Sequence, residues 1–321
     1  MKRLSVVAIA SHTAETRALH GYLSWLPETR GKDSHQECKH PKISIIMPSY
    51  NQARYLERSI LSVLNQGYSN LEFIIIDGGS TDGSIEIIKK YEGYIAYWHS
   101  RPDSGQSDAL NQGFSKATGD IFGWLNSDDL YLSGAFEHAV EAFSLHCAAR
   151  VVFGDWWEID SEDKVTCVQH AFDFSLGHFI YEGFHLNSQS MFWRREVHER
   201  FGDFDVNLHR TMDYDLILRI GLAEGQDVFS RIPYPLACFR RHEEQKTIGF
   251  DSAVYNEHHQ IALRNGLGNK YSLLGDAIRL IYRFRRAYWY VKRGGFTNLV
   301  KRSGGWRKRL KDIMHFRVSH C

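Results

Sequence analysis

The chain has 321 residues, of which 43% are hydrophobic and 24% are charged, with a formal net charge of +1. This length is enough for one large α/β domain with an appendage, or for two modest domains, and its core needs no disulfides. From residue 270 onward there are 14 Lys and Arg but only two Asp, so this tail has a net charge of +12 and the rest of the chain about −11. A basic tail is attracted to anionic surfaces, whereas an acidic body argues against a nucleic-acid-binding protein.

The cysteines and the apolar runs indicate where in the cell the protein resides. The five cysteines are scattered and never spaced as CxxC, which indicates a reducing environment without a disulfide framework or a zinc site. The apolar run Leu4–Ala10 is at the short limit for a signal peptide, and no stretch is long enough to cross a membrane. We expect a cytoplasmic protein, held peripherally at the inner face of a membrane.

From residue 42 the sequence alternates between two periodicities. Short β-branched runs predict buried strands, and apolar residues at helical spacing predict helices between them. The expected strands are 43–47, 71–77, 94–98 and 120–126, and the expected helices are 53–66, 81–91, 107–117 and 133–145. Such alternation predicts a mostly parallel sheet covered by helices on both faces, with ligands at the carboxyl ends of the strands.

After about residue 150 the pattern changes. Short strands are expected at 151–154, 165–168, 190–193 and 232–240, and a helix at 212–222. Helices dominate from about residue 251. Residues 279–293 interleave apolar side chains with Arg and Lys, which is typical of an amphipathic helix at a membrane surface.

The segment GWLNSDDL (123–130) places Asp128 and Asp129 directly after a predicted buried strand. Adjacent buried carboxylates are costly unless a cation compensates them, and their hard oxygens suit Mg²⁺ or Mn²⁺. Taken alone, the segment is equally consistent with a helix cap formed by Ser127 or Asp128.

The segment IIIDGGSTDGS (74–84) places Asp77 at the end of a strand, before a pair of glycines that permit a tight turn. Asp77 could accept hydrogen bonds from the base or ribose of a nucleotide. A simple capping role for Ser80 or Thr81 is the alternative. Neither GxGxxG nor GxxxxGK[ST] occurs, so dinucleotide and P-loop sites are not expected.

Two further segments are ambiguous by themselves. In TMDYDLILRI (211–220), Asp213 could act as a general base, or only favour the start of a helix. In CFRRHEEQKT (238–247), His242 could bind a metal. Arg240, Arg241 and Lys246 could hold a diphosphate, or form a solvated run of charges.

In this order, the segments resemble family 2 of the inverting glycosyltransferases, which have the GT-A fold. The likeness rests on ISIIMPSYNQARYLERSILSVLNQGYSNLEFIIIDGGSTDGS, GQSDALNQGFSKATGDIFGWLNSDD and FGDFDVNLHRTMDYDLILR, and it spans roughly residues 42–247. It implies an N-terminal extension and linker (1–41), a GT-A domain (42–250) with a donor half (42–150) and an acceptor half (151–250), and a basic helical extension (251–321).

The resemblance also implies roles for residues. The donor nucleotide would contact Pro48, Ser49, Tyr50, Asp77, Asp108, Asn126 and Ser127. Asp77 matches the acid that reads the base, usually uracil, but Gly78 stands where many members have a second Asp. Asn111 and Gly113 match an N.G motif. Asn126 replaces the first acid of the family's DxD motif, and Asp128 would bind the metal.

On the acceptor side, Asp213 matches the catalytic base, and His242 matches a His that completes the metal or diphosphate site. Trp156, Trp157, Phe184 and His185 are candidates for stacking on the acceptor, or are core aromatics.

The implied reaction is a single displacement with Mg²⁺ or Mn²⁺. It moves a sugar from a nucleoside diphosphate, with UDP expected, to a saccharide or lipid-linked acceptor in surface polysaccharide synthesis, with an anionic membrane as a partner of 270–321. Two alternatives remain: a non-catalytic sugar-nucleotide binder, to which Asn126 and Gly78 point, and a nucleotidyltransferase.

Overall fold

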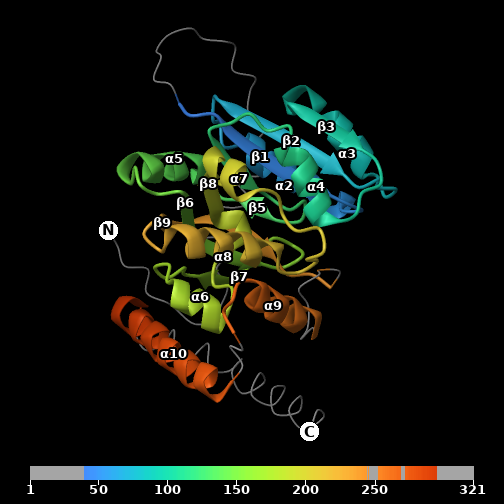
Figure 1. The fold of residues 1–321 in the computed structure, drawn as a ribbon. Helices are drawn as coiled ribbons and strands as arrows, with labels where there is room; N and C mark the ends of the chain where they lie inside the picture. Colours follow the sequence, from blue (N-terminus) through green and yellow to red (C-terminus); the bar gives the residue numbers. More distant parts are fainter. Residues whose placement is uncertain (1–39, 244, 246–251, 269–271, 295–321) are drawn as a thin grey trace. The chain divides into compact units, whose positions relative to one another are not determined.

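The computed structural model of the chain describes residues 40–243, 245, 252–268 and 272–294 (Figure 1). The described residues up to Gly268 belong to one compact unit, and residues 272–294 belong to a second unit. Residues 1–39 of the predicted N-terminal extension, Lys246 and residues 295–321 of the basic tail lie outside the described residues. None of the described helices is both long and apolar enough to cross a membrane.

The first half of the larger unit alternates strands and helices as predicted. Its elements are β1 (Ile43–Ser49), α2 (Ala53–Leu64), β2 (Leu71–Asp77), α3 (Ser84–Lys90), the 3₁₀ turn η1 (Glu92–Tyr94), β3 (Tyr97–Ser100), α4 (Gln106–Phe114), β4 (Ile121–Trp124), β5 (Leu130–Tyr131) and α5 (Ala135–Leu145).

The second half mixes short elements with two longer ones. They are β6 (Val151–Ile159), β7 (Val165–Gln169), α6 (Leu176–Glu182), the 3₁₀ turn η2 (Ser188–Ser190), β8 (Met191–Arg194), α7 (Arg195–Phe201), α8 (Met212–Glu224), β9 (Phe229–Arg240) and α9 (Ser252–Arg264). In the smaller unit, the described residues form the helix α10 (Leu273–Gly294).

All the strands of the described residues form one sheet, in the order β3-β2-β1-β4-β8-β6-β9-β5, with β7 beside β6. The β3-β2-β1-β4 part is parallel. Strand β8 is antiparallel to both β4 and β6, and β6 and β9 are parallel to each other. The carboxyl ends of β1, β2 and β4 therefore meet at one edge, as expected for a ligand site.

Helices cover both faces of the sheet because alternate strand residues point to opposite sides (Figure 1). In β1, Ile45 and Met47 pack into a core with α2, α3 and α5, whereas Ile46 packs into a core with α4 and α8. Gly113 of α4 explains how closely that helix lies on β1: a Cβ there would be only 2.4 Å from Ile46 Cγ2.

Several details differ from the sequence prediction. The strand expected at 151–154 continues to Ile159 as β6, and the strand expected at 232–240 begins earlier, at Phe229, as β9. The strand expected at 94–98 is wrong in position, because residues 92–94 form η1 and the strand begins at Tyr97. The strand expected at 120–126 ends at Trp124, so Asn126 lies in a loop. The short elements β5, α6 and α7 are absent from the sequence prediction.

Helix α9 was assigned to the C-terminal extension, yet its contacts tie it to the larger unit. Glu257 accepts hydrogen bonds from the backbone N–H of His209 and Arg210, each 3.1 Å long. Arg264 forms ion pairs with Asp205 and Asp215. These contacts hold the loop that leads into α8.

Candidate active site

The two carboxylates after β4 have different surroundings. Asp129 is 1% exposed, and its Oδ1 accepts a hydrogen bond from the backbone N–H of Arg240 (2.8 Å). Its Oδ2 accepts a bond from Asn126 Nδ2 (3.2 Å). Asp128 is instead partly exposed, and its Oδ2 lies 2.9 Å from His242 Nε2. Asp129 therefore anchors the loop from within, while Asp128 remains available to a ligand.

The electrostatics of this loop favour a cation. Burial raises the pKa of Asp129 well above its ordinary value, and the charge of Asp128 raises it further. Asn126 contributes no third negative charge. Its Oδ1 accepts a hydrogen bond from Gln106 Nε2 (2.8 Å), which connects the loop to the start of α4.

His242 and Asp128 form a candidate pair of metal ligands. Their side chains are 4% and 16% exposed, and the His242 ring lies against Tyr55 with 4.8 Å between ring centroids. Among the described residues, no three or more His, Cys, Asp or Glu side chains gather closely enough to hold a metal ion. An ion at this pair would take its remaining ligands from water or from a substrate diphosphate.

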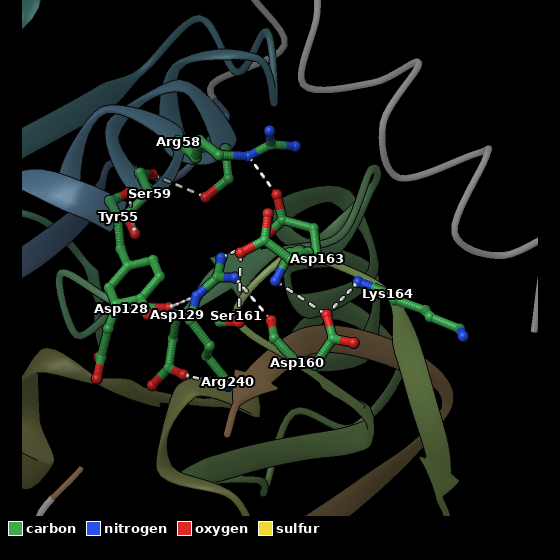
Figure 2. Close-up of polar contacts among 12 residues, drawn as sticks. Tyr55, Arg58, Ser59, Asp128, Asp129, Asp160, Ser161, Asp163, Lys164 and Arg240 are labelled. Atoms are coloured by element: carbon green, nitrogen blue, oxygen red, sulfur yellow. Dashed lines mark hydrogen bonds and ion pairs between the residues drawn. The ribbon is translucent and has the colours of Figure 1, made fainter. Parts of the chain in front are cut away.

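Arg240 supports the acidic loop from behind (Figure 2). Its side chain is 1% exposed, with Nε donating to the carbonyl of Asp128 (2.6 Å) and Nη1 to the carbonyl of Asp160 (3.0 Å). Its Nη2 pairs with Asp163 Oδ1 at 2.5 Å, and Arg58 Nε also pairs with Asp163 at 2.5 Å. The idea that Arg240 holds a diphosphate is therefore wrong, because its guanidinium is buried against protein groups.

Arg241 is also engaged. Its Nη2 lies 3.3 Å from Glu158 Oε1 in an exposed pair. Such an exposed pair contributes little stability.

On the nucleotide side, β1 ends with Pro48 and Ser49, both buried, and Tyr50 follows with 63% of its surface exposed. Ser127 is buried, and its carbonyl accepts a hydrogen bond from Ser59 Oγ (2.9 Å). These residues line the meeting edge of the parallel strands.

Asp77 is fully buried at the end of β2, where its carboxylate holds a turn together. Oδ2 accepts hydrogen bonds from the backbone N–H of Gly79 (3.1 Å) and Ser80 (2.8 Å). Ser80 Oγ donates to Oδ1 (2.6 Å) and Ser100 Oγ donates to Oδ2 (2.6 Å). Four bonds from the chain itself thus occupy the carboxylate.

Two other donor-side candidates also have local partners. Asp108 accepts a bond from the backbone N–H of Ser104 (2.9 Å), which fixes the loop before α4. Asn111 exchanges two bonds of 2.9 Å with the backbone of Phe204. Asn111 therefore ties α4 to the loop that leads into α8.

Asp213 lies in the first turn of α8. Burial raises its pKa above the ordinary value, although hydrogen bonds from Ser188 Oγ and the Tyr214 N–H oppose the rise. Ser188 belongs to η2, which precedes β8 and so lies at the carboxyl end of antiparallel β4. Ser107, next to Gln106 in α4, is 3.0 Å from the sulfur of Met212. The start of α4 thus contacts both the acidic loop and the residue beside Asp213.

The aromatic acceptor candidates do not share one surface. Trp156 packs against the core formed with α4 and α8, whereas Trp157 packs against the small cluster around Leu130 and Cys238 on the other face of β6. Phe184 packs against Phe179. His185 lies against Phe172 (5.2 Å between centroids) in a separate small apolar pocket.

Several supporting residues gave no signal in the sequence. Asp163, Ser188 and Glu257 contact the site from segments far away in the chain. Only their partners in space identify them.

Comparison with known sequences points to a family. A model described as Glycosyl transferase family 2 matches residues 44–202. An uncharacterized glycosyltransferase of Mycobacterium tuberculosis (strain H37Rv) is 33% identical over 185 residues, which are 57% of this chain and 70% of that protein. An uncharacterized glycosyltransferase of Rickettsia typhi is 31% identical over 188 residues, which are 55% of this chain and 57% of that protein.

Solved structures agree on the architecture. S. aureus TarS 1-349, in complex with UDP-GlcNAc, is 17% identical with a TM-score of 0.58, over 69% of this chain and 66% of that one. The mannosyltransferase PcManGT from Pyrobaculum calidifontis, in complex with GDP-Man and Mn²⁺, is 16% identical with a TM-score of 0.54, over 92% of this chain and 87% of that one. At these identities the likeness concerns the fold, and it confirms the predicted α/β architecture of GT-A type.

Proposed function

Because this chain belongs to glycosyl transferase family 2, we propose that it moves a sugar from a nucleoside-diphosphate donor to a hydroxyl of a saccharide or lipid-linked acceptor, with inversion at the anomeric carbon. One observation carries this proposal. The start of α4 contacts both the loop that holds Asp128, which lies against His242, and the residue beside Asp213, a partly buried carboxylate of raised pKa. UDP is the expected nucleotide, and surface polysaccharide synthesis is the expected context.

Asp128 and His242 fit a divalent ion such as Mg²⁺ or Mn²⁺. One carboxylate oxygen and one imidazole nitrogen lie 2.9 Å apart, beside the buried Asp129, whose ionised form a nearby cation would favour. Few protein ligands suit an ion that also binds substrate phosphates, and PcManGT offers a precedent with Mn²⁺. Such an ion offsets the charge that develops on the departing diphosphate.

Asp213 would serve as the general base. Its raised pKa makes it a better proton acceptor than an ordinary aspartate, while Ser188 and the Tyr214 N–H fix its orientation. In this role Asp213 takes the proton of the acceptor hydroxyl as that oxygen attacks the anomeric carbon. Positioning of the acceptor against the donor supplies much of the remaining acceleration.

The proposal is tested by thermal unfolding with Mn²⁺ and UDP, GDP, dTDP or CDP. We expect one nucleotide to raise the unfolding temperature only when metal is present, and Asp128→Ala to abolish that rise. The matched control is Asp227→Ala, an exposed aspartate in the loop before β9 at the other end of the strands, which should behave as wild type. A metal-independent rise that survives in Asp128→Ala would contradict the site.

A membrane-side acceptor is supported by helix α10. Apolar side chains on it are exposed and recur at helical spacing: Leu280, Ile281, Phe284, Tyr288 and Val291. Arg279, Arg283, Arg285 and Arg286 alternate with them, as in helices that bind anionic interfaces. The full chain should therefore co-sediment with vesicles that have the anionic lipid composition of the inner face of the membrane. The double variant Phe284→Glu, Tyr288→Glu should not co-sediment. Unchanged sedimentation would contradict the membrane role.

A further inference from the structure

The paired glycines after β2 leave room for another loop. The Gly78 N–H donates to the Ser49 carbonyl (2.8 Å) and so continues the pairing of β2 with β1. A Cβ at position 78 would lie 2.9 Å from Asp103 Oδ2 and 3.3 Å from Tyr50 Cδ2. A Cβ at Gly79 would lie 3.2 Å from the backbone N of Pro102. The missing side chains therefore let the loop after β3 come close to the nucleotide side of the site.

The carboxylate of Asp103 occupies the space that a side chain at position 78 would fill. Its Oδ1 accepts a hydrogen bond from the Gly105 N–H (2.8 Å), which holds the side chain in its loop, and its Oδ2 is the oxygen nearest Gly78. Tyr50, the most exposed aromatic ring at this edge, lies beside the same spot. Asp77 lies in the turn below, fully buried and already bonded to four groups of the chain.

We infer that Asp103, rather than Asp77, is the acid that reads the base of the donor nucleotide, with the Tyr50 ring available for stacking. This inference rests on the proposed function and names the specificity-determining residue of its donor site. The glycine at position 78 then does not remove a contact to the base, because the Asp103 carboxylate reaches the same place from a different loop.

The chemistry of a carboxylate sets the base preference. An ionised carboxylate only accepts hydrogen bonds. Uracil, thymine and guanine present a ring N–H on their pairing edge, whereas adenine and cytosine present a ring nitrogen lone pair there. Asp103 should therefore favour UDP, dTDP or GDP over CDP and ADP.

The test is calorimetric titration of the full chain, in Mn²⁺, with UDP, GDP, CDP, ADP and inorganic diphosphate. Asp103→Ala should weaken the preferred nucleotide roughly tenfold to a hundredfold, as expected for loss of a charged hydrogen bond. Asp103→Ala should also reduce the difference in affinity between nucleotides with preferred and disfavoured bases. The affinity for inorganic diphosphate should not change. Asp227→Ala is the matched control, and unfolding temperatures verify that each variant is folded.

A second variant moves the carboxylate back. Gly78 is outside the left-handed region, so an aspartate there meets no backbone strain. Gly78→Asp combined with Asp103→Ala should restore the base preference that Asp103→Ala loses.

The outcomes separate the two proposals. If wild type binds no nucleoside diphosphate, the proposed function fails. If wild type binds with a base preference that Asp103→Ala keeps, this inference fails and the proposed function stands. If Asp103→Ala weakens inorganic diphosphate as much as the nucleotide, Asp103 only shapes the loop and the inference is overturned.

Discussion

Glu72 is the second residue of strand β2 and lies at the amino end of the parallel strands, while Asp129 and Asp213 lie near the carboxyl end. Glu72 accepts hydrogen bonds from Lys42 Nζ (2.6 Å), Ser44 Oγ (2.5 Å) and both the N–H and the hydroxyl of Thr118 (2.6 and 2.7 Å). Burial alone would raise its pKa, but these bonds outweigh burial and lower the pKa to about 2.

At the carboxyl ends of the strands, the effect of burial on the pKa exceeds that of the hydrogen bonds. Burial raises the pKa of both Asp129 and Asp213, and the hydrogen bonds they receive do not overcome it. The amino end thus stabilises its negative charge with the chain's own groups. At the carboxyl end the chain's own groups compensate the ionised carboxylates only in part, so that a metal, a proton or a substrate can complete the compensation, which is typical of functional sites.

The variant with the largest expected effect is Asp213→Asn, which tests whether a carboxyl of raised pKa at the carboxyl end is functional. Loss of a general base should lower turnover roughly 10²- to 10⁴-fold, because the acceptor hydroxyl keeps its proton. Thermal stability should be retained or slightly increased, since burial disfavours the ionised carboxylate that is removed. Release of the nucleoside diphosphate and the unfolding temperature are the measurements. Equal turnover in variant and wild type would remove Asp213 from its assigned role.

Asp128→Asn tests the neighbouring charge. Metal-dependent nucleotide affinity should fall roughly tenfold to a hundredfold. Without metal or nucleotide, however, the variant should unfold at a higher temperature than wild type, because the charge of Asp128 disfavours ionised Asp129. The control is Asp227→Asn, for which neither quantity should change. A metal-free unfolding temperature below that of wild type would show that Asp128 is itself a stabilising residue.

Much of the fold could be predicted from the sequence where a run of residues allowed one interpretation. The predicted strand 71–77 is β2 with the same bounds, because its continuous apolar run is buried on both faces. The run 94–98 is equally apolar, yet only packing decides that Tyr94 ends a 3₁₀ turn and Tyr97 begins the strand.

The candidate site was predictable only in part. From the resemblance, Asp128 and His242 were assigned to the same site, although they are 114 positions apart in the chain. Sequence reasoning missed the buried pair of Arg240 and Asp163, because nothing local distinguishes them from surface charges. It likewise could not show that Asp103 fills the space at Gly78, since two separate loops create that contact.

At the amino end, Glu72→Gln should lower the free energy of unfolding by about 2–3 kcal/mol, because it removes a buried, fully bonded carboxylate. Turnover of the folded enzyme should remain within about twofold of wild type, since Glu72 lies away from the site. Urea unfolding measures the first quantity. Glu86→Gln, at an exposed position on α3, is the matched control and should change neither.

The same residue predicts a pH dependence of stability. The pKa of Glu72 is about 2 in the folded chain against 4.5 as its ordinary value. Its stabilising contribution is therefore complete above pH 4.5 and is lost as the pH falls through about 2. The stability difference between wild type and Glu72→Gln should shrink across that window, and a constant difference would contradict this account.

The mildest probe is Ser188→Ala, because it leaves both carboxylates in place. The Ser188 hydroxyl lowers the pKa of Asp213 by bonding to its ionised form. Without that bond the pKa should rise further, and a base with a higher pKa is lost to protonation at a higher pH. The fall of kcat/KM on the acid side should thus move to higher pH, while plateau turnover drops less than about fivefold. A profile that stays in place while turnover falls would mean that Ser188 only orients Asp213, and that burial alone sets the basicity of the site.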